Sequence, residues 1–294
     1  MERKQYQPSY YWWLGAALLV LLAVGSVFDF QISQSLYSGN ETVFGKVFAA
    51  LGEIPSFIGV AAGGVYLLTV QPKSKVKNAF FKLLGAGLTT AAAAVSYTQS
   101  VEALPELSLL VAVFTAAVFV LAIVFFGRVY QSCDRAQALR FALIVFFFCI
   151  VTLAVVNGAK YVWARPRMRL IFQNGEVVFK NWWQPGRAQR TLFVAQGIDA
   201  QEFRSFPSGH TAGAACSLFL MLLPMLRGKG SVHTGFWISV IFTALVAFSR
   251  ITMGAHFLTD VTLSWGIAFL AYLLASYLFG GDTKGCRVAE KLLA

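Results

Sequence analysis

Long apolar runs alternate with short polar segments along this chain. The runs cover about residues 11–30, 47–70, 78–97, 106–127, 140–160, 208–226, 233–251 and 258–279. Because a helix of about 20 apolar residues crosses the hydrocarbon core of a bilayer, each run is long enough to span a membrane. The pattern therefore predicts an all-α, polytopic bundle of about eight transmembrane helices.

The composition supports this interpretation and limits the partners of the chain. Of its 294 residues, 57% are hydrophobic and only 13% are charged, and the mean hydropathy is +0.66. The net charge of +11 could suggest nucleic acid, but the basic residues lie mainly in short segments between the apolar runs and not on one solvated face. We expect an integral membrane protein whose partner is the lipid bilayer and not nucleic acid.

Basic residues in alternate loops predict the orientation of the bundle. Under the positive-inside rule, short loops with an excess of Lys and Arg lie in the cytoplasm. The rule places both termini in the cytoplasm, and it places segments 31–46, 98–105, 161–207 and 252–257 outside the cytoplasmic (plasma) membrane. The basic residues on which this rests are Arg3, Lys4, Lys73, Lys75, Lys77, Lys82, Arg128, Arg135, Arg140, Arg227, Lys229, Lys284, Arg287 and Lys291.

Segment 161–207 departs from the charge pattern of the other outward segments. It carries seven basic residues against three acidic ones, on the side where bases are usually scarce. We therefore expect a partly ordered extracytoplasmic loop with a function that requires positive charge. The expected organisation is about four N-terminal helices in 1–139, a core in 140–280 that contains this loop, and a cytoplasmic tail in 281–294.

The stretch Arg204-Ser-Phe-Pro-Ser-Gly-His210 is a polar turn that leads directly into an apolar helix. Pro207 fits the first turn of that helix, and Ser208 and Gly209 leave backbone N–H groups free beside it. Free N–H groups at the positive end of a helix dipole attract anions, and His210 would meet a bound phosphate there as a proton donor or acceptor. Taken alone, the turn also fits a capped helix start with an incidental histidine.

Two further polar clusters lie at the predicted outer ends of other helices. One is Lys160-Tyr-Val-Trp-Ala-Arg-Pro-Arg167, and the other lies between the last two apolar runs and ends at Asp260. His256 and Asp260 are four residues apart and share a helix face, so the carboxylate can take the imidazole N–H and leave the other nitrogen free as a nucleophile or base. Arg250 can reach the same anion. A plain helix-end hydrogen bond between the histidine and the aspartate is the alternative.

Together the three clusters resemble the signature of the type-2 phosphatidic acid phosphatase superfamily, which shares its catalytic core with vanadium haloperoxidases and acid phosphatases. That signature reads Lys, six residues, Arg-Pro; then Pro-Ser-Gly-His; then Ser-Arg, five residues, His, three residues, Asp. The second part, at 207–210, and the third, at 249–260, match fully. The resemblance covers about residues 140–280, and the family's usual six helices leave two helices of this chain as additional.

The first part of the signature is matched with one departure. Lys160 and Arg167 have the expected spacing, but Met168 stands where the family usually has Pro. We interpret Arg165-Pro166 as an additional upstream Arg-Pro pair, because shifting the motif onto it would replace the Lys by Gly158.

The resemblance implies a phosphatase in which His256 attacks phosphorus to give a phosphohistidine, with Asp260 orienting it. His210 would protonate the leaving oxygen and later activate water. This agrees with the physics of phosphoryl transfer, in which positioning and charge neutralisation supply most of the catalysis. The groups expected to hold the phosphoryl oxygens are Lys160, Arg167, Ser208, the N–H of Gly209, and Arg250.

The outward segments contain no cluster of carboxylates with metal-ligand spacing, so we expect no metal and no cofactor. The substrate would be a phosphomonoester or pyrophosphate of a lipid, hydrolysed at the extracytoplasmic face. Phosphatidic acid, phosphatidylglycerophosphate, undecaprenyl pyrophosphate and lipid A all fit. Two other functions use the same pocket: a phosphotransferase between lipids, and a non-catalytic lipid-phosphate binder or transporter.

Glu53 is an acidic residue near the outer end of the second apolar run, two residues before Pro55. Ionisable residues within membrane segments commonly mark a functional site. The sequence leaves two interpretations open: the side chain faces the catalytic bundle, or it pairs with a base such as Lys46.

Overall fold

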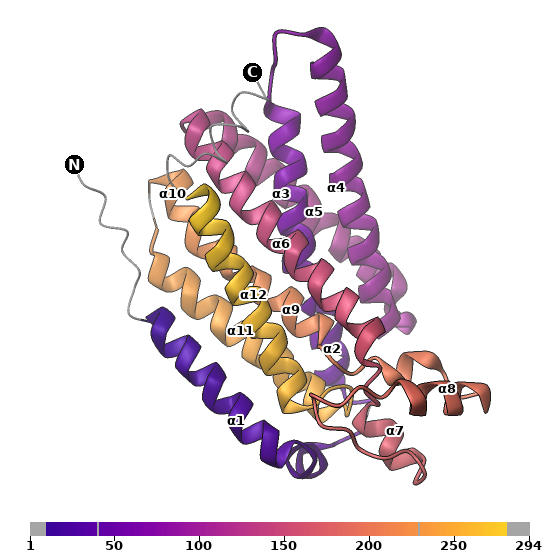
Figure 1. Ribbon diagram of the computed structural model, residues 1–294. Coiled ribbons are helices and arrows are strands. Elements are labelled where there is room, and N and C mark those ends of the chain that lie inside the picture. The colour runs from indigo at the N-terminus through magenta and orange to yellow at the C-terminus, as the bar shows by residue number, and fades with distance from the viewer. Residues whose placement is uncertain (1–9, 40, 229, 281–294) are drawn as a thin grey trace.

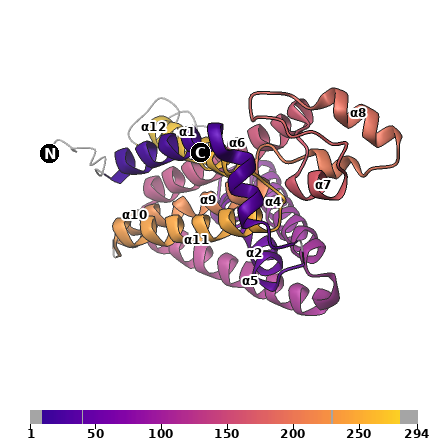
Figure 2. The same cartoon turned by 90° about the horizontal axis from the view of Figure 1, so that it is seen from below.

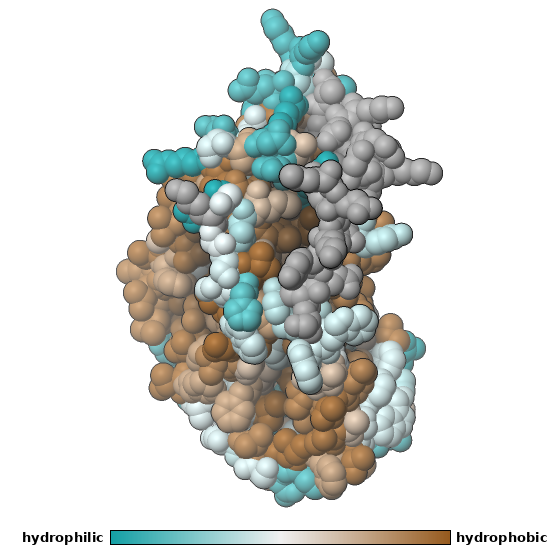
Figure 3. All heavy atoms as spheres, turned by 90° about the vertical axis from the view of Figure 1, so that its left-hand side faces the viewer, coloured by the Kyte–Doolittle hydropathy of each residue, from teal (hydrophilic) through white to brown (hydrophobic). Residues whose placement is uncertain are grey.

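The computed structural model describes residues 10–39, 41–228 and 230–280, and these residues form helices and turns without any strand. The expected tail at 281–294 lies outside them. Hydrophobic side chains cover a broad area of the face shown in Figure 3, and hydrophilic ones gather mainly at its upper end. Eight helical stretches are long and apolar enough to cross a membrane, which confirms the predicted bundle of a multi-pass membrane protein: Tyr10–Leu36, Val43–Thr69, Lys75–Ala103, Pro105–Ser132, Arg135–Gln173, Gly209–Arg227, Val232–Thr252 and Leu258–Phe279.

Six long helices make up most of the bundle, and several of them begin at a polar capping residue. The side chains of Ser74, Asp134 and Ser231 accept hydrogen bonds from backbone N–H groups three residues later, which satisfies donors that a helix start leaves unpaired. Helix α1 lies beside α12 (Figure 1). The six are α1 (Tyr10–Leu36), α4 (Lys75–Ala103), α5 (Ser108–Ser132, preceded by the 3₁₀ turn Pro105–Leu107), α6 (Arg135–Trp163), α11 (Val232–Thr252) and α12 (Leu258–Phe279).

The second and sixth spans are interrupted within their apolar runs, which the apolar pattern did not predict. The second span consists of α2 (Val43–Gly52) and α3 (Ile54–Thr69), which meet at Glu53. The sixth consists of α9 (Gly209–Ala215), a 3₁₀ stretch (Cys216–Leu222) and α10 (Leu223–Arg227). Pro55 and Pro224 lie in the first turns of α3 and α10, where the missing N–H of proline costs nothing.

The long segment between α6 and α9 has its own small apolar core. It contains α7 (Met168–Gln173), α8 (Arg187–Ala195) and the 3₁₀ turn Ala200–Phe203. Figure 1 shows α7 and α8 together at one end of the bundle, and Figure 2 shows that they lie to one side of it. The core residues are Leu170, Val177, Phe193 and Phe203.

A buried ion-pair network fastens α1 to α12 at this end of the bundle. The side chain of Arg165 is fully buried and pairs with Asp29 on α1, Nη2 to Oδ2 at 2.7 Å, and with Asp260 on α12. Its Nε also donates to the carbonyl of Lys180 at 2.7 Å, and its guanidinium lies 4.2 Å from the ring centroid of Phe257. Burying one cation between two carboxylates is stable only when every partner is present.

Replacing Arg165 by Met should therefore destabilise the protein strongly. The substitution keeps apolar volume but leaves the carboxylates of Asp29 and Asp260 buried beside each other without a cation, which we expect to cost about 3–5 kcal/mol. The measurement is a denaturant series on detergent-purified protein. Arg187→Met is the matched control, because Arg187 is exposed and its loss should cost about 1 kcal/mol or less. Equal effects from the two variants would contradict the network's role.

Candidate active site

The turn between α11 and α12 brings Arg250 and His256 together. The backbone N–H groups of Ala255 and His256 both donate to the carbonyl of Arg250, at 3.1 and 3.3 Å. Gly254 makes this turn possible, because its φ of +62° is a conformation that residues with a side chain rarely adopt. The guanidinium and the imidazole therefore belong to one closed turn, as the spacing in the sequence suggested.

Asp260 is held rigidly in the first turn of α12. Its Oδ2 accepts the backbone N–H of Phe257 at 2.8 Å and the hydroxyl of Ser205 at 2.6 Å, while Oδ1 accepts from Arg165. The carboxylate is fully buried, so each of these bonds replaces a contact that water would otherwise make.

The imidazole of His256 is oriented by a backbone carbonyl and not by Asp260 alone. Its Nδ1 makes a short contact with the carbonyl oxygen of Ser205, whereas Oδ2 of Asp260 lies 3.8 Å away, within ion-pair range but beyond a hydrogen bond. The expectation that Asp260 takes the imidazole N–H directly was therefore wrong in detail. A carbonyl can only accept, so Nδ1 carries the proton and Nε2 keeps its lone pair.

The surroundings of His256 keep its imidazole neutral. Burial, and then the charges of Arg167, Lys160 and Arg250, hold the pKa of His256 well below its usual range, although the hydrogen bond with Ser205 acts in the opposite direction. A neutral imidazole with a free Nε2 near pH 7 is chemically suited to act as a nucleophile or a base.

Three cations converge on the same place from different elements. Lys160 lies in the last turn of α6, Arg167 follows that helix, and Arg250 lies in the last turn of α11. All three interact electrostatically with His210 as well as with His256. Arg250 is only 5% exposed, yet its Nε and Nη1 find no hydrogen-bond partner among the described residues. Buried guanidinium nitrogens without partners are costly unless they bind an anion.

Arg167 also has a carboxylate partner within segment 161–207. Its Nη1 lies 3.3 Å from Oε1 of Glu202, and Arg169 pairs with the same carboxylate. The Nε of Arg167 has no hydrogen-bond partner within the described part of the chain. Arg167 is thus partly neutralised and still has a donor available.

The start of α9 is both a capped helix and part of the cluster. The hydroxyl of Ser208 accepts the N–H of Thr211 at 3.3 Å, and α9 begins at Gly209. Pro207 lies before this cap, so placing it in the first turn was wrong. A Cβ on Gly209 would lie 2.8 Å from Nζ of Lys160, so only glycine lets the lysine come this close.

Met168 occupies the position at which the resemblance expects a proline. Helix α7 begins at Met168 directly after Arg167, and the first position of a helix is where proline is best tolerated. Methionine there continues the same local structure, and its side chain is fully buried. Arg167 therefore still lies directly before the first residue of α7, although Met replaces Pro there.

All eight residues predicted for the site lie in this region. The backbone N–H of Ser208 donates to the carbonyl of Asp260 at 3.3 Å, which links the second cluster to the third. The contact between Gly209 and Lys160 links it to the first. The eight are Lys160, Arg167, Ser208, Gly209, His210, Arg250, His256 and Asp260.

Three residues at the site were not predicted. Ser205 contacts both His256 and Asp260, Arg165 pairs with Asp260, and Asp29 pairs with Arg165. Each carried a signal in the sequence: Ser205 and Arg165 lie within the quoted clusters, and Asp29 is an acidic residue inside an apolar run. Their partners lie too far away in the chain to be recognised from spacing.

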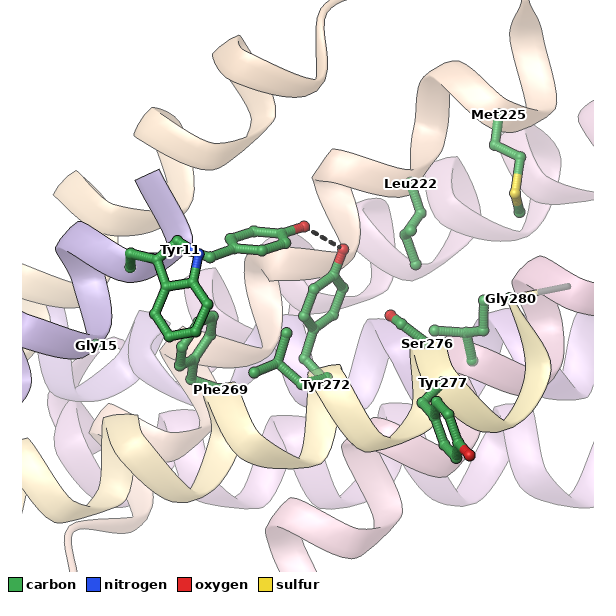
Figure 4. Close-up of a pocket in the computed structure, with 12 residues that line it drawn as sticks. Tyr11, Gly15, Leu222, Met225, Phe269, Tyr272, Ser276, Tyr277 and Gly280 are labelled. Carbon is green, nitrogen blue, oxygen red and sulfur yellow. Dashed lines mark hydrogen bonds between the residues drawn. The ribbon is translucent and has the colours of Figure 1, made fainter. Parts of the chain in front are cut away.

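A separate apolar pocket lies between α1, α6, α10 and α12 (Figure 4). Its polar feature is a hydrogen bond of 3.0 Å between the hydroxyls of Tyr11 and Tyr272. Tyr11 lines the pocket, whereas Asp29 pairs with Arg165 beside the candidate site. The two residues are 18 positions apart on one helix, so the pocket is about 27 Å from that site. Its lining contains none of the residues predicted for the site.

Comparison with known proteins identifies the family of this chain. Phosphatidylglycerophosphatase B of Bacillus subtilis (strain 168) is 31% identical to this chain over 157 residues, which cover 48% of this chain and 72% of that protein. No solved structure was found to match the present chain. Residues 141–284, which contain both histidines and all three cations of the cluster, match the PAP2 superfamily. The chain belongs to the type-2 phosphatidic acid phosphatase (PAP2) superfamily and is a membrane lipid phosphatase.

Proposed function

We propose that this phosphatase hydrolyses a phosphomonoester or pyrophosphate of a lipid through a phosphohistidine on His256. The observation that supports this most directly is the state of that imidazole: Nδ1 faces the carbonyl of Ser205, and Nε2 is left with its lone pair. The cations that act on it, Lys160, Arg167 and Arg250, suit the equatorial oxygens of a phosphoryl group.

In the first step, Nε2 of His256 forms a bond to phosphorus and the bond between phosphorus and the leaving oxygen breaks. His210 gives a proton to that oxygen, so the alcohol or phosphate leaves in its protonated form. The imidazole of His256 gains positive charge, which the carboxylate of Asp260 at 3.8 Å stabilises.

In the second step, a water molecule gives a proton to His210 while its oxygen forms a bond to phosphorus. The bond between phosphorus and Nε2 of His256 breaks, and inorganic phosphate leaves. Each histidine returns to its starting state, so one acid–base group serves both steps.

We propose that the reaction needs no metal ion. Three side-chain cations provide the charge neutralisation that Mg²⁺ supplies in other phosphoryl-transfer enzymes, and among the residues that the structure describes no group of three or more His, Cys, Asp or Glu is arranged to hold a metal.

The lipid itself is one of a few candidates. Apolar helices around a charged site suit a substrate whose tail stays in the bilayer while its phosphate enters the cluster. The name of the Bacillus relative makes phosphatidylglycerophosphate a natural first choice, beside phosphatidic acid, undecaprenyl pyrophosphate and lipid A. We place the site at the outer face of the cytoplasmic membrane, because the loops at the opposite ends of the helices carry the excess of Lys and Arg.

Purified protein assayed on a panel of these lipids with an excess of chelator should release inorganic phosphate, and His256→Ala should lower that release by about 10³-fold or more because the nucleophile is lost. With ³²P-labelled lipid, label should be trapped on the wild type in an acid-labile, alkali-stable form and be absent from the variant.

His233→Ala is the matched control for this experiment. His233 is exposed and belongs to the start of α11, so its loss should leave turnover unchanged. Hydrolysis that survives His256→Ala would refute the mechanism, and activity that requires added metal would refute metal independence. Transfer of label to a lipid acceptor without phosphate release would identify a phosphotransferase, and binding without either product would identify a binder.

The proposed orientation is tested by thiol labelling in intact cells. Gly175 lies in the outer segment, is exposed, and has open space around it. Gly175→Cys should react with an impermeant thiol reagent in intact cells, whereas Lys73→Cys, in the loop between α3 and α4, should react only after permeabilisation. The wild type provides the background labelling. The reverse pattern would place the site in the cytoplasm.

A further inference from the structure

Glu53 stands at the junction of two helices and faces the catalytic cluster. Helix α2 ends at Gly52 and α3 begins at Ile54, so Glu53 belongs to neither. It lies outside residues 141–284, the region that matches the superfamily. The two interpretations left open by the sequence are now distinguished, because Lys46 pairs with Glu41 and Glu106, and Glu53 lies beside His210.

The carboxylate of Glu53 lies beside one particular nitrogen of His210. Oε1 of Glu53 lies 3.5 Å from Nδ1 of His210, and the two side chains are only 14% and 23% exposed. Both belong to backbones that pack very closely. A Cβ on Gly213 would lie 2.8 Å from Cα of Glu53, and a Cβ on Gly52 would lie 3.2 Å from Cβ of His210. This close packing gives the carboxylate little freedom to move away.

Glu53 is a negative charge among cations that also act on His210. Lys160 and Arg250 interact electrostatically with Glu53, and both also act on His210. A Cβ on Gly209 would meet Nζ of Lys160 at 2.8 Å and Oε1 of Glu53 at 3.0 Å, so the two side chains border the first residue of α9 together. Lys160 and Arg250 disfavour the positively charged imidazolium form of His210. A carboxylate beside Nδ1 favours that form and so counteracts the effect of the two cations.

We propose that Glu53 is the positioning carboxylate of His210: it faces the N–H on Nδ1 as an acceptor, directs Nε2 toward the leaving oxygen, and stabilises the imidazolium that must form in each catalytic cycle. This inference rests on the proposed role of His210 as acid and base. It gives each catalytic histidine its own carboxylate, Asp260 for His256 and Glu53 for His210, with the second one supplied from outside the region that matches the superfamily.

Glu53 would act in both steps of the proposed reaction. When the bond between phosphorus and the leaving oxygen breaks, the proton on Nε2 of His210 moves to that oxygen, and the Nδ1 proton stays between the imidazole and Glu53. When water attacks, its proton returns to Nε2, and Glu53 again faces an imidazolium. The carboxylate itself is not protonated at either step.

The test compares Glu53→Gln with the wild type on two substrates, dioctanoyl phosphatidic acid and 4-nitrophenyl phosphate. An alkoxide is a poor leaving group that needs a proton, whereas nitrophenolate leaves readily without one. We expect kcat/KM to fall by about 10- to 100-fold for the phosphatidic acid and by less than about 3-fold for the nitrophenyl ester. Because kcat/KM reports the steps up to departure of the leaving group, the later attack of water does not enter the comparison.

Two further variants control this experiment. Glu102→Gln removes an exposed carboxylate whose charge acts on Glu53 but which does not contact His210, and it should leave both kcat/KM values unchanged. Glu53→Asp keeps the charge and should retain part of the activity on phosphatidic acid. Gln is nearly isosteric with Glu, and thermal unfolding of Glu53→Gln should match the wild type.

An equal loss on both substrates would overturn the proposal, because Glu53 would then act through Lys160 or through the fold. No loss on either substrate would overturn it as well. The proposed function fails separately: a wild type that releases no phosphate from any lipid of the panel refutes hydrolysis. A His210→Ala variant with equal losses on the two substrates refutes the role of His210 as the acid, and the role of Glu53 then falls with it.

Discussion

The buried carboxylate of Asp260 is the group on which the geometry of the site depends. It accepts hydrogen bonds from Arg165, from the hydroxyl of Ser205 and from the backbone of Phe257. An anion fully removed from water needs hydrogen-bond donors and a cation as partners, so the positions of these three groups are coupled. Ser205 in turn places its carbonyl against His256, and the position of this imidazole thus follows from the burial of one carboxylate.

Helices outside the region that matches the superfamily supply charges to this arrangement. Asp29 on α1 shares Arg165 with Asp260, and its other oxygen accepts the backbone N–H of Thr259 at 2.9 Å. Glu53 approaches His210 from the break between α2 and α3. Both carboxylates thus lie in a region of the structure that is rich in cations. The N-terminal helices therefore contribute charged side chains to this region as well as membrane spans.

Much of the fold and the cluster followed from patterns that are local in the chain. Eight apolar runs predicted the eight spans, because length and hydropathy suffice to identify a membrane helix. The spacing from Arg250 to Asp260 predicted a shared turn, since its geometry depends on a few consecutive residues. Contacts between residues that are distant in the chain could not be predicted from such patterns. Arg165 was set aside as an additional Arg-Pro pair, and nothing near Glu53 in the chain indicates that it meets His210.

By itself, the sequence determined that this chain crosses the membrane repeatedly and carries three motifs that resemble the signature of the superfamily, because hydropathy, caps and motif spacing are properties of neighbouring residues. Only the tertiary structure decided which partners those motifs meet. Arg165 and Asp29 are 136 residues apart, and Thr259 is 230 residues from Asp29. Contacts of this kind depend on how whole helices pack, and burial then selects the pairings, since a charge without a partner has no stable place inside the bundle.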